Sequence, residues 1–193
     1  MSNRWIGSCG LGEAAGIAVV ATVYAALDRG VLIADAPWIL AAGAWEGLCL
    51  GSAQALVLAR SGIARSRWIG VTVFGAVIGY GGSLLGGAGS GGEDQTEPAL
   101  WLIAVLGAVM GLAMGAVLGG LQGVAARGTI SAGRWIVLNM AGWAPAMAII
   151  MLAASLVDRS IPLIGIAAVG ALSGGLAGLA LGAVTRRGLP RHG

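Results

Sequence analysis

The chain has 193 residues, of which 58% are hydrophobic and 10% are charged, and its mean hydropathy is +0.90. This composition lies far from that of soluble globular domains and indicates a protein that is embedded in a lipid bilayer. All 11 basic residues are arginines, and they lie at segment boundaries instead of forming a basic patch with interleaved aromatic residues. We therefore expect no nucleic-acid partner.

Six segments are long and apolar enough to cross a hydrocarbon core about 30 Å thick, which takes about 20 residues of α-helix. In chain order they are Trp5 to Leu27, Pro37 to Ala59, Trp68 to about Leu85, Pro98 to Ala126, Trp135 to Val157, and Ile161 to Val184. The connections are short, except for a glycine-rich polar loop over residues 86–97. The sequence predicts an all-α membrane protein in which residues 1–193 form a single integral membrane domain.

Charged residues divide between the two sets of helix ends. One set has no acid and carries nine arginines: Arg4, Arg60, Arg65, Arg67, Arg127, Arg134, Arg186, Arg187 and Arg191. The opposite loops carry six acids and only Arg29 and Arg159. By the positive-inside rule, the arginine-rich ends and both termini are expected in the cytoplasm. We expect a multi-pass protein of the bacterial cytoplasmic (inner) membrane.

Two motifs recur about every 65 residues, which indicates an internal repeat. Arg-Trp-Ile begins the odd-numbered segments, and a proline lies near the start of each even-numbered segment, at Pro37, Pro98 and Pro162. The sequence predicts three repeats of a two-helix hairpin, at about residues 4–66, 67–133 and 134–193. Arginine and tryptophan both suit the headgroup boundary, so we expect six interface anchors: Arg4, Trp5, Arg67, Trp68, Arg134 and Trp135.

Glycines recur every four residues in the even-numbered segments. They are Gly43, Gly47 and Gly51 in the second, Gly107, Gly111, Gly115 and Gly119 in the fourth, and Gly170, Gly174, Gly178 and Gly182 in the sixth. This spacing keeps glycines on one helix face and lets the backbone of another helix approach closely, as in a glycine zipper. We expect a pseudo-threefold arrangement with these faces near the centre, although a linear zipper would use the same residues.

The repeats also share their helix ends. Gly51-Ser-Ala-Gln54 is followed by Arg60, and Gly119-Gly-Leu-Gln122 by Arg127, while the third copy keeps Arg186 without a glutamine. This G-x-x-Q…R…R-W pattern resembles that of small, uncharacterised polytopic membrane proteins of bacteria that repeat a Gly-x-x-Gln-Trp…Arg helix end. The likeness covers the second through fifth segments, lacks the tryptophan after each glutamine, and implies an architecture but no activity.

Glu13 and Glu46 are the only ionisable residues well inside the predicted spans. A carboxylate there is costly, so it either marks a proton or ion pathway or is a neutral hydrogen-bonding partner of nearby serine, amide or indole groups. Because side chains lean towards their own helix N-terminus and the two helices are antiparallel, we expect the carboxyl groups to diverge. We expect Gln54, Gln122 and Asn139 to form interhelical hydrogen bonds.

Catalytic and cofactor chemistry has little support in the sequence. The single histidine is His192, near the C-terminus, and no Cys, His or acidic residues have metal-ligand spacing. No nucleophile lies beside a base and its orienting group. We therefore expect no enzyme activity, catalytic residue, cofactor or metal.

Two functional classes remain open. The first is an accessory, structural or assembly subunit of a larger bacterial membrane complex, which would pack against other membrane subunits or a second copy of itself. The alternative is a small proton- or cation-linked transporter or channel that uses Glu13 and Glu46. Internal repeats are common in transporters and favour this alternative.

Overall fold

The computed structural model describes residues 2–87 and 98–189. Within these ranges the chain forms helices and no strand, which confirms the predicted all-α class. The α-helices are α1 (Ser2–Asp28), α2 (Asp35–Val57), α3 (Arg65–Gly87), α4 (Leu100–Ala125), α5 (Ala132–Ser155) and α6 (Leu163–Thr185). Short 3-10 helices, Leu58–Arg60 and Arg186–Gly188, follow α2 and α6. Most of the polar loop predicted over residues 86–97 lies outside the described residues.

Five of these six helices are long and apolar enough to cross a membrane: α1, α3, α4, α5 and α6. Helix α2 has 23 residues and is as long as α3 and α6, but it does not reach the same hydropathy. Glu46 and Gln54 lie within it and reduce its mean hydropathy.

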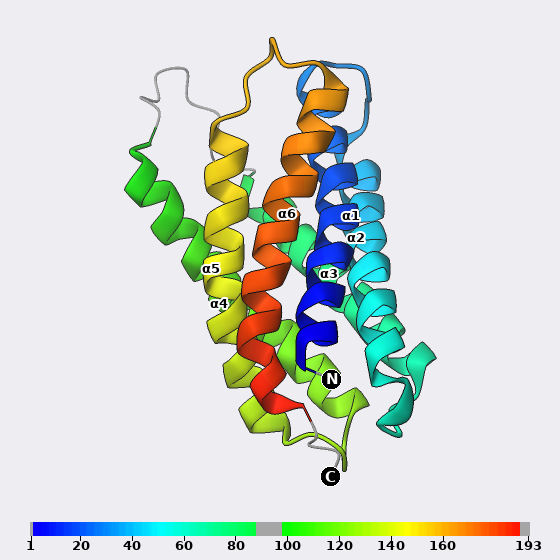
Figure 1. Ribbon diagram of the computed structural model, residues 1–193. Helices are drawn as coiled ribbons and strands as arrows, with labels where there is room; N and C mark the ends of the chain where they lie inside the picture. The colour runs from blue at the N-terminus through cyan, green and yellow to red at the C-terminus, as the bar shows by residue number, and fades with distance from the viewer. Residues whose placement is uncertain (1, 88–97, 190–193) are drawn as a thin grey trace.

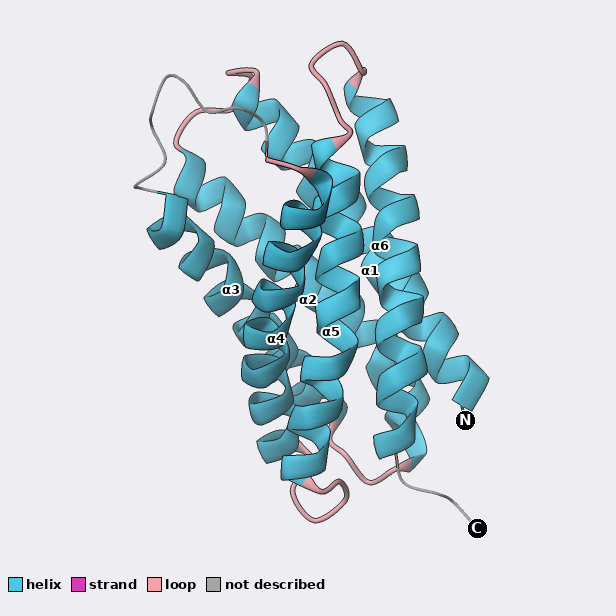
Figure 2. Cartoon of the chain, turned by 90° about the vertical axis from the view of Figure 1, so that its left-hand side faces the viewer, coloured by secondary structure: helices cyan, strands magenta, loops and turns pink. Residues whose placement is uncertain are grey.

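The helices form a closed ring in which each packs against its neighbours in the chain and α1 packs against α6. Figures 1 and 2 show them running up and down the long axis of the molecule, with α1 beginning and α6 ending at the same end. The contact between α1 and α6 joins the first and last helices. The ring is therefore held together by helix pairs that are adjacent in the sequence and by one pair that is far apart in it.

The glycine stripes lie where each even-numbered helix meets the odd-numbered helix that follows it around the ring. A Cβ atom added at the last glycine of each stripe would come within 3.2 Å of the Cα atom of an Arg-Trp-Ile isoleucine. The pairs are Gly51 with Ile69, Gly119 with Ile136, and Gly182 with Ile6. One turn earlier, Gly47, Gly115 and Gly178 face the backbones of Val73, Met140 and Gly10. The helix pairs α2–α3, α4–α5 and α6–α1 therefore share one packing register.

This packing corrects the expected position of the glycine faces. They do not meet one another at the centre of the ring, because each is covered by the backbone of an odd-numbered helix. Close backbone approach is favourable in these pairs because association of membrane helices depends on van der Waals packing and not on a difference in polarity from the lipid tails.

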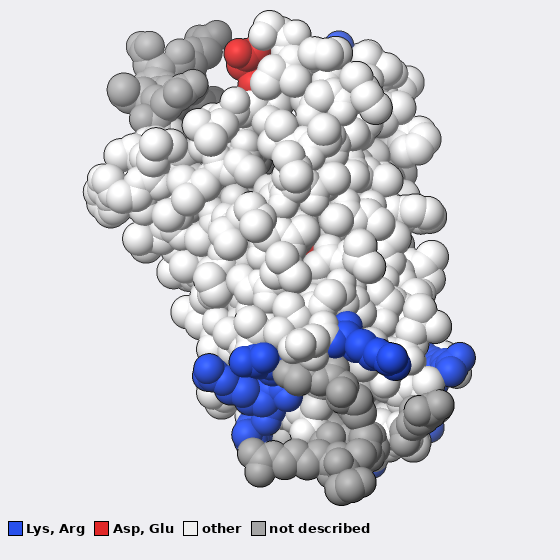
Figure 3. Space-filling view, viewed as in Figure 1, with Lys and Arg blue, Asp and Glu red and all other residues white. Residues whose placement is uncertain are grey.

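The two ends of the bundle differ in charge, as Figure 3 shows. Exposed arginines gather at the end where α1 begins, and they are Arg4, Arg65, Arg67, Arg127, Arg134, Arg186 and Arg187. At the opposite end, Arg159 donates two hydrogen bonds of 2.8 Å to Asp28 and thereby connects the α5–α6 loop to the end of α1. Hydrogen bonds from the side chain and backbone of Ser160 hold the pKa of Asp158 below its usual range.

Replacing Gly111 by alanine tests the packing of α4 on α5. The new Cβ atom would lie 2.8 Å from the Cα atom of Ala144 and would overlap the carbonyl oxygen of Trp143, so the two backbones must separate. We expect Gly111→Ala to reduce the free energy of unfolding by about 1–3 kcal/mol, measured as a lower thermal unfolding midpoint in detergent. Gly120→Ala is the matched control on the same helix, because a Cβ atom there has nothing within 4 Å. Equal midpoints for the two variants would contradict the close approach of α4 and α5.

Candidate functional site

Three tryptophans from the Arg-Trp-Ile motifs meet in the interior of the bundle. Trp5, Trp68 and Trp135 are each 0% exposed, and their ring centroids lie 5.8 to 6.4 Å apart in edge-to-face contacts. This position corrects the expectation that their indoles anchor the protein at the lipid interface. Consecutive residues of a helix point in directions about 100° apart, so the preceding arginines face outwards while the tryptophans face inwards.

Each buried indole N–H donates a hydrogen bond to a side chain at the end of an even-numbered helix. Trp68 Nε1 donates to Gln54 Oε1 at 3.0 Å and Trp135 Nε1 to Gln122 Oε1 at 3.0 Å. In the third helix pair, α6 and α1, Trp5 Nε1 donates to Thr185 Oγ1 at 2.9 Å. We call these six residues the tryptophan layer. The sequence reasoning missed Thr185, although Gly182-Ala-Val-Thr185 has the same spacing as the two Gly-x-x-Gln segments.

The glutamine amides and nearby polar side chains extend this layer by one helical turn. Gln54 Nε2 lies 3.5 Å from Cys9 Sγ, and Gln122 Nε2 donates to Thr72 Oγ1 at 3.0 Å. Asn139 lies in the corresponding place of α5 but donates to its own helix, at Trp135 O. Gln122 Nε2 also donates to Gln54 Oε1 at 3.4 Å, so the two predicted glutamines meet in the structure.

Glu13 and Glu46 lie together at a second level of the bundle. Glu13 follows Trp5 by eight residues and Glu46 precedes Gln54 by eight, so each lies about 12 Å from the tryptophan layer along its antiparallel helix. Their exposed fractions are 1% and 3%, and the two groups are close enough to interact electrostatically. On α1 the residue that packs on Glu46 is Gly16, three residues after Glu13, so the two glutamates are offset by about 4.5 Å along the bundle.

The two carboxyl groups have different hydrogen-bonding environments. The hydroxyl group of Tyr80 in α3 donates a hydrogen bond to Glu46 Oε2. Neither oxygen of Glu13 has a hydrogen-bond partner among the described residues. Two of the groups expected as partners are used elsewhere, because Ser8 donates to Trp5 O and Gln54 belongs to the tryptophan layer.

Tyr80 contacts Glu46 because α2 and α3 differ from the other glycine-packed pairs at this level. A Cβ atom at Gly43 would meet the Tyr80 ring, whereas at the matching Gly111 and Gly174 it would meet backbone carbonyl oxygens. The sequence reasoning did not single out Tyr80. Tyr80 follows Trp68 by 12 residues, which turns it about 120° away from the tryptophan side of α3, so the Trp68 face of the helix did not point to it.

The acid pair occurs once in the ring. Eight residues after Trp68 and Trp135 stand Ala76 and Trp143, and eight residues before Gln122 and Thr185 stand Met114 and Ala177. In α1, Gly16 packs directly on Glu46, where an added Cβ atom would lie 2.8 Å from Glu46 Cγ. Helices α1 and α2 thus approach closely beside the two acids.

The chemistry available at this level is that of two carboxyl groups and a phenol. The described residues hold no group of three or more His, Cys, Asp or Glu side chains that would bind a metal ion. Burying one ionised carboxylate in an apolar interior is costly, and burying two beside each other costs more. We call Glu13, Glu46 and Tyr80 the acid site.

Comparisons of the chain with protein-family models, with curated proteins and with solved structures found no match. The resemblance to small bacterial membrane proteins therefore stays a prediction.

Replacing Thr185 by valine tests the tryptophan layer with little change of shape. The indole N–H of Trp5 would lose its acceptor while it remains buried, and a buried donor without a partner costs about 1–3 kcal/mol. We expect a lower thermal unfolding midpoint in detergent. Thr22→Val is the matched control, because the Thr22 hydroxyl donates only to the carbonyl group of Ala18 in its own helix. A Thr185→Val midpoint as high as that of the control would contradict the role of this bond.

Proposed function

We propose that this protein is a small proton- or cation-linked transporter or channel in which Glu13 and Glu46 handle the transported ion. The observation that carries the proposal is Glu13, a carboxyl group that is 1% exposed and has no hydrogen-bond partner among the described residues. Ionisable groups within membrane spans are rare, and they are typical of proton relays and ion pathways. A purely structural carboxyl group would be expected to have a donor or acceptor beside it.

The proposed architecture is six transmembrane helices built as three repeats of a hairpin, with α2 as the sixth span. The shared glycine register and the equivalent places of Gln54, Gln122 and Thr185 support the repeat. We place both termini in the cytoplasm and the protein in the bacterial inner membrane, because the arginines gather at the end where α1 begins.

A second role, as an accessory or assembly subunit of a larger membrane complex, is favoured by a different observation. The axis of the bundle is filled by the three tryptophan rings at the arginine-rich end, and backbones pack directly along the glycine faces. Such an interior suits a stable packing unit. In this role, other membrane subunits or a second copy of the chain would cover the apolar outer surface.

Ion flux in liposomes tests the first role. The purified protein is reconstituted with a pH-sensitive dye inside the vesicles, and a potassium diffusion potential drives the flux. We expect proton or cation movement with the native chain and background movement with Glu13→Gln plus Glu46→Gln, because the amides cannot exchange protons or balance a cation. Asp35→Asn is the control, since Asp35 is an exposed carboxylate at the start of α2.

Two results would count against the transport role. One is flux that survives in the double variant at the native rate. The other is a native chain that moves no ion and is isolated from its membrane in a fixed ratio with another membrane protein, which would favour the accessory role.

A further inference from the structure

We propose that the ion handled at the acid site is the proton, that Glu13 stores it, and that Tyr80 and Glu46 form the route between Glu13 and the end of the bundle with the acidic loops. This inference rests on the transport role proposed above and specifies its substrate and its path. Three features support it: the oxygen atoms that the acid site offers to an ion, the hydrogen bonds of the two carboxyl groups, and the position of Tyr80.

The ligand set fits a proton and not a metal cation. Hard cations such as Mg²⁺ and Ca²⁺ take six or more oxygen ligands, and the acid site offers two carboxyl groups and one hydroxyl group. The close contact of Gly16 with Glu46 leaves little space for a hydrated ion between α1 and α2. A proton needs only one oxygen atom and adds no volume.

The hydrogen bonds separate the roles of the two acids. Glu46 accepts a hydrogen bond from Tyr80, which stabilises a negative charge on its carboxylate. Glu13 accepts none from any described residue, so its surroundings offer nothing to stabilise a charge. Two environments that differ in this way assign different protonation states to a pair of acids. Glu13 is therefore the neutral, proton-bearing member.

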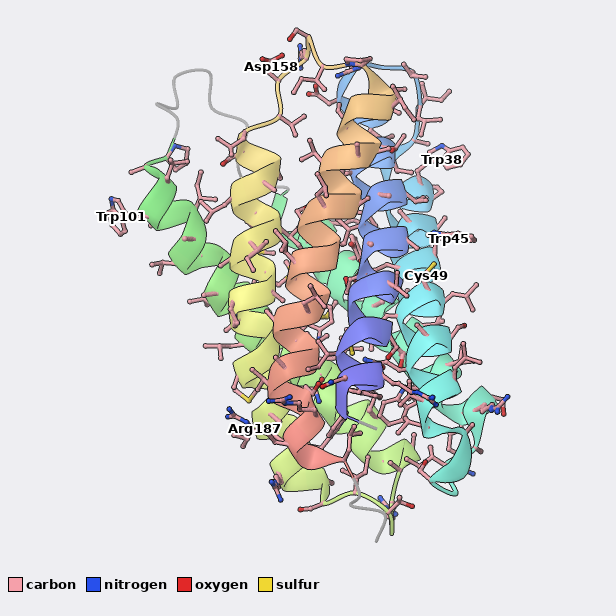
Figure 4. The ribbon with its side chains drawn as sticks, in the orientation of Figure 1. Trp38, Trp45, Cys49, Trp101, Asp158 and Arg187 are labelled. Carbon is pink, nitrogen blue, oxygen red and sulfur yellow. The ribbon has the colours of Figure 1, made fainter. Side chains whose placement is uncertain are left out.

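Tyr80 connects this pair to the outside of the bundle. Its side chain is half-buried, and it lies seven residues before α3 ends at Gly87, about 10 Å along the helix. In the opposite direction, the three rings of the tryptophan layer lie between the acid site and the arginine-rich end. The end with the acidic loops is thus the nearer surface. Figure 4 shows Trp38 and Trp45 of α2 pointing outwards from the bundle.

A proton moves along this route without any other reactant. The phenol of Tyr80 passes its proton to the carboxylate of Glu46 and takes one from a hydronium ion at its exposed side, so the hydroxyl group is regenerated and a water molecule is released. Because neither Glu13 oxygen is hydrogen-bonded to Glu46, Glu46 passes the proton to an ionised Glu13 through one intervening water molecule. The other titratable groups within electrostatic range are Cys49 beside both acids, Cys9 beside Glu13, and Tyr24 beside Tyr80.

Replacing Tyr80 by phenylalanine tests the route in the liposome flux assay. The substitution removes only the hydroxyl group, and we expect proton flux to fall roughly tenfold or more, as when a positioned proton-transfer group is lost. Ser155→Ala is the control, because it also removes only a hydroxyl group, and Ser155 is exposed at the end of α5 and donates to Leu152 O in its own helix; it should leave the flux unchanged. Replacing external sodium by choline should also leave the native flux unchanged.

The outcomes distinguish this inference from the proposed function. A native chain that moves no ion overturns the transport role itself. Sodium movement without proton movement, or a Tyr80→Phe rate equal to the native rate, keeps the transport role and overturns the proton route.

Carbodiimide labelling tests the storage role of Glu13 without measuring flux. Dicyclohexylcarbodiimide partitions into bilayers and reacts with protonated carboxyl groups there. We expect mass spectrometry to find the label on Glu13 in both the native chain and Tyr80→Phe, and to find it lost in Glu13→Gln. Label on Glu46 alone would overturn the assignment of the stored proton to Glu13.

Discussion

Three buried indole N–H groups constrain the rest of the structure. A polar group without a partner is costly in an apolar interior, so each indole must have an acceptor. Each finds it on the helix that precedes its own around the ring: Gln54 for Trp68, Gln122 for Trp135 and Thr185 for Trp5. The bonds join the glycine-packed pairs α2–α3, α4–α5 and α6–α1. Meeting this one requirement three times fixes the register within each pair, and the edge-to-face contacts of the three indole rings connect the pairs into the ring.

The acid site follows from the same register. Glu13 and Glu46 are each eight residues from the tryptophan layer, so the bonds that fix this layer also bring the two residues within about one helical turn of each other along the bundle. Glycines then decide the distances between helices. Gly16 brings α1 close to Glu46, whereas the Tyr80 ring on Gly43 occupies the space between α2 and α3. The result is one paired acid, one unpaired acid, and a phenol between them and the surface.

Hydropathy and charge predicted the helices well, because bilayer thickness and the position of arginines act on whole segments. The direction of single side chains was harder to predict. An Arg-Trp dipeptide is compatible with two lipid-facing anchors and with an outward arginine beside an inward tryptophan. The packing of the helices determines which direction the tryptophan takes. Thr185 was missed because a short hydroxyl side chain replaces a longer amide at the same position. Tyr80 was missed because its partner lies on another helix 34 residues away.

Hydrogen exchange of the indole N–H groups measures the tryptophan layer directly. In detergent micelles, two-dimensional nuclear magnetic resonance resolves the indole signals of the seven tryptophans. The N–H groups of Trp5, Trp68 and Trp135 should exchange with deuterium far more slowly than those of the exposed Trp38 and Trp101. Slow exchange of all three would support a ring closed by buried bonds. Exchange of any of the three as fast as that of Trp38 or Trp101 would contradict it.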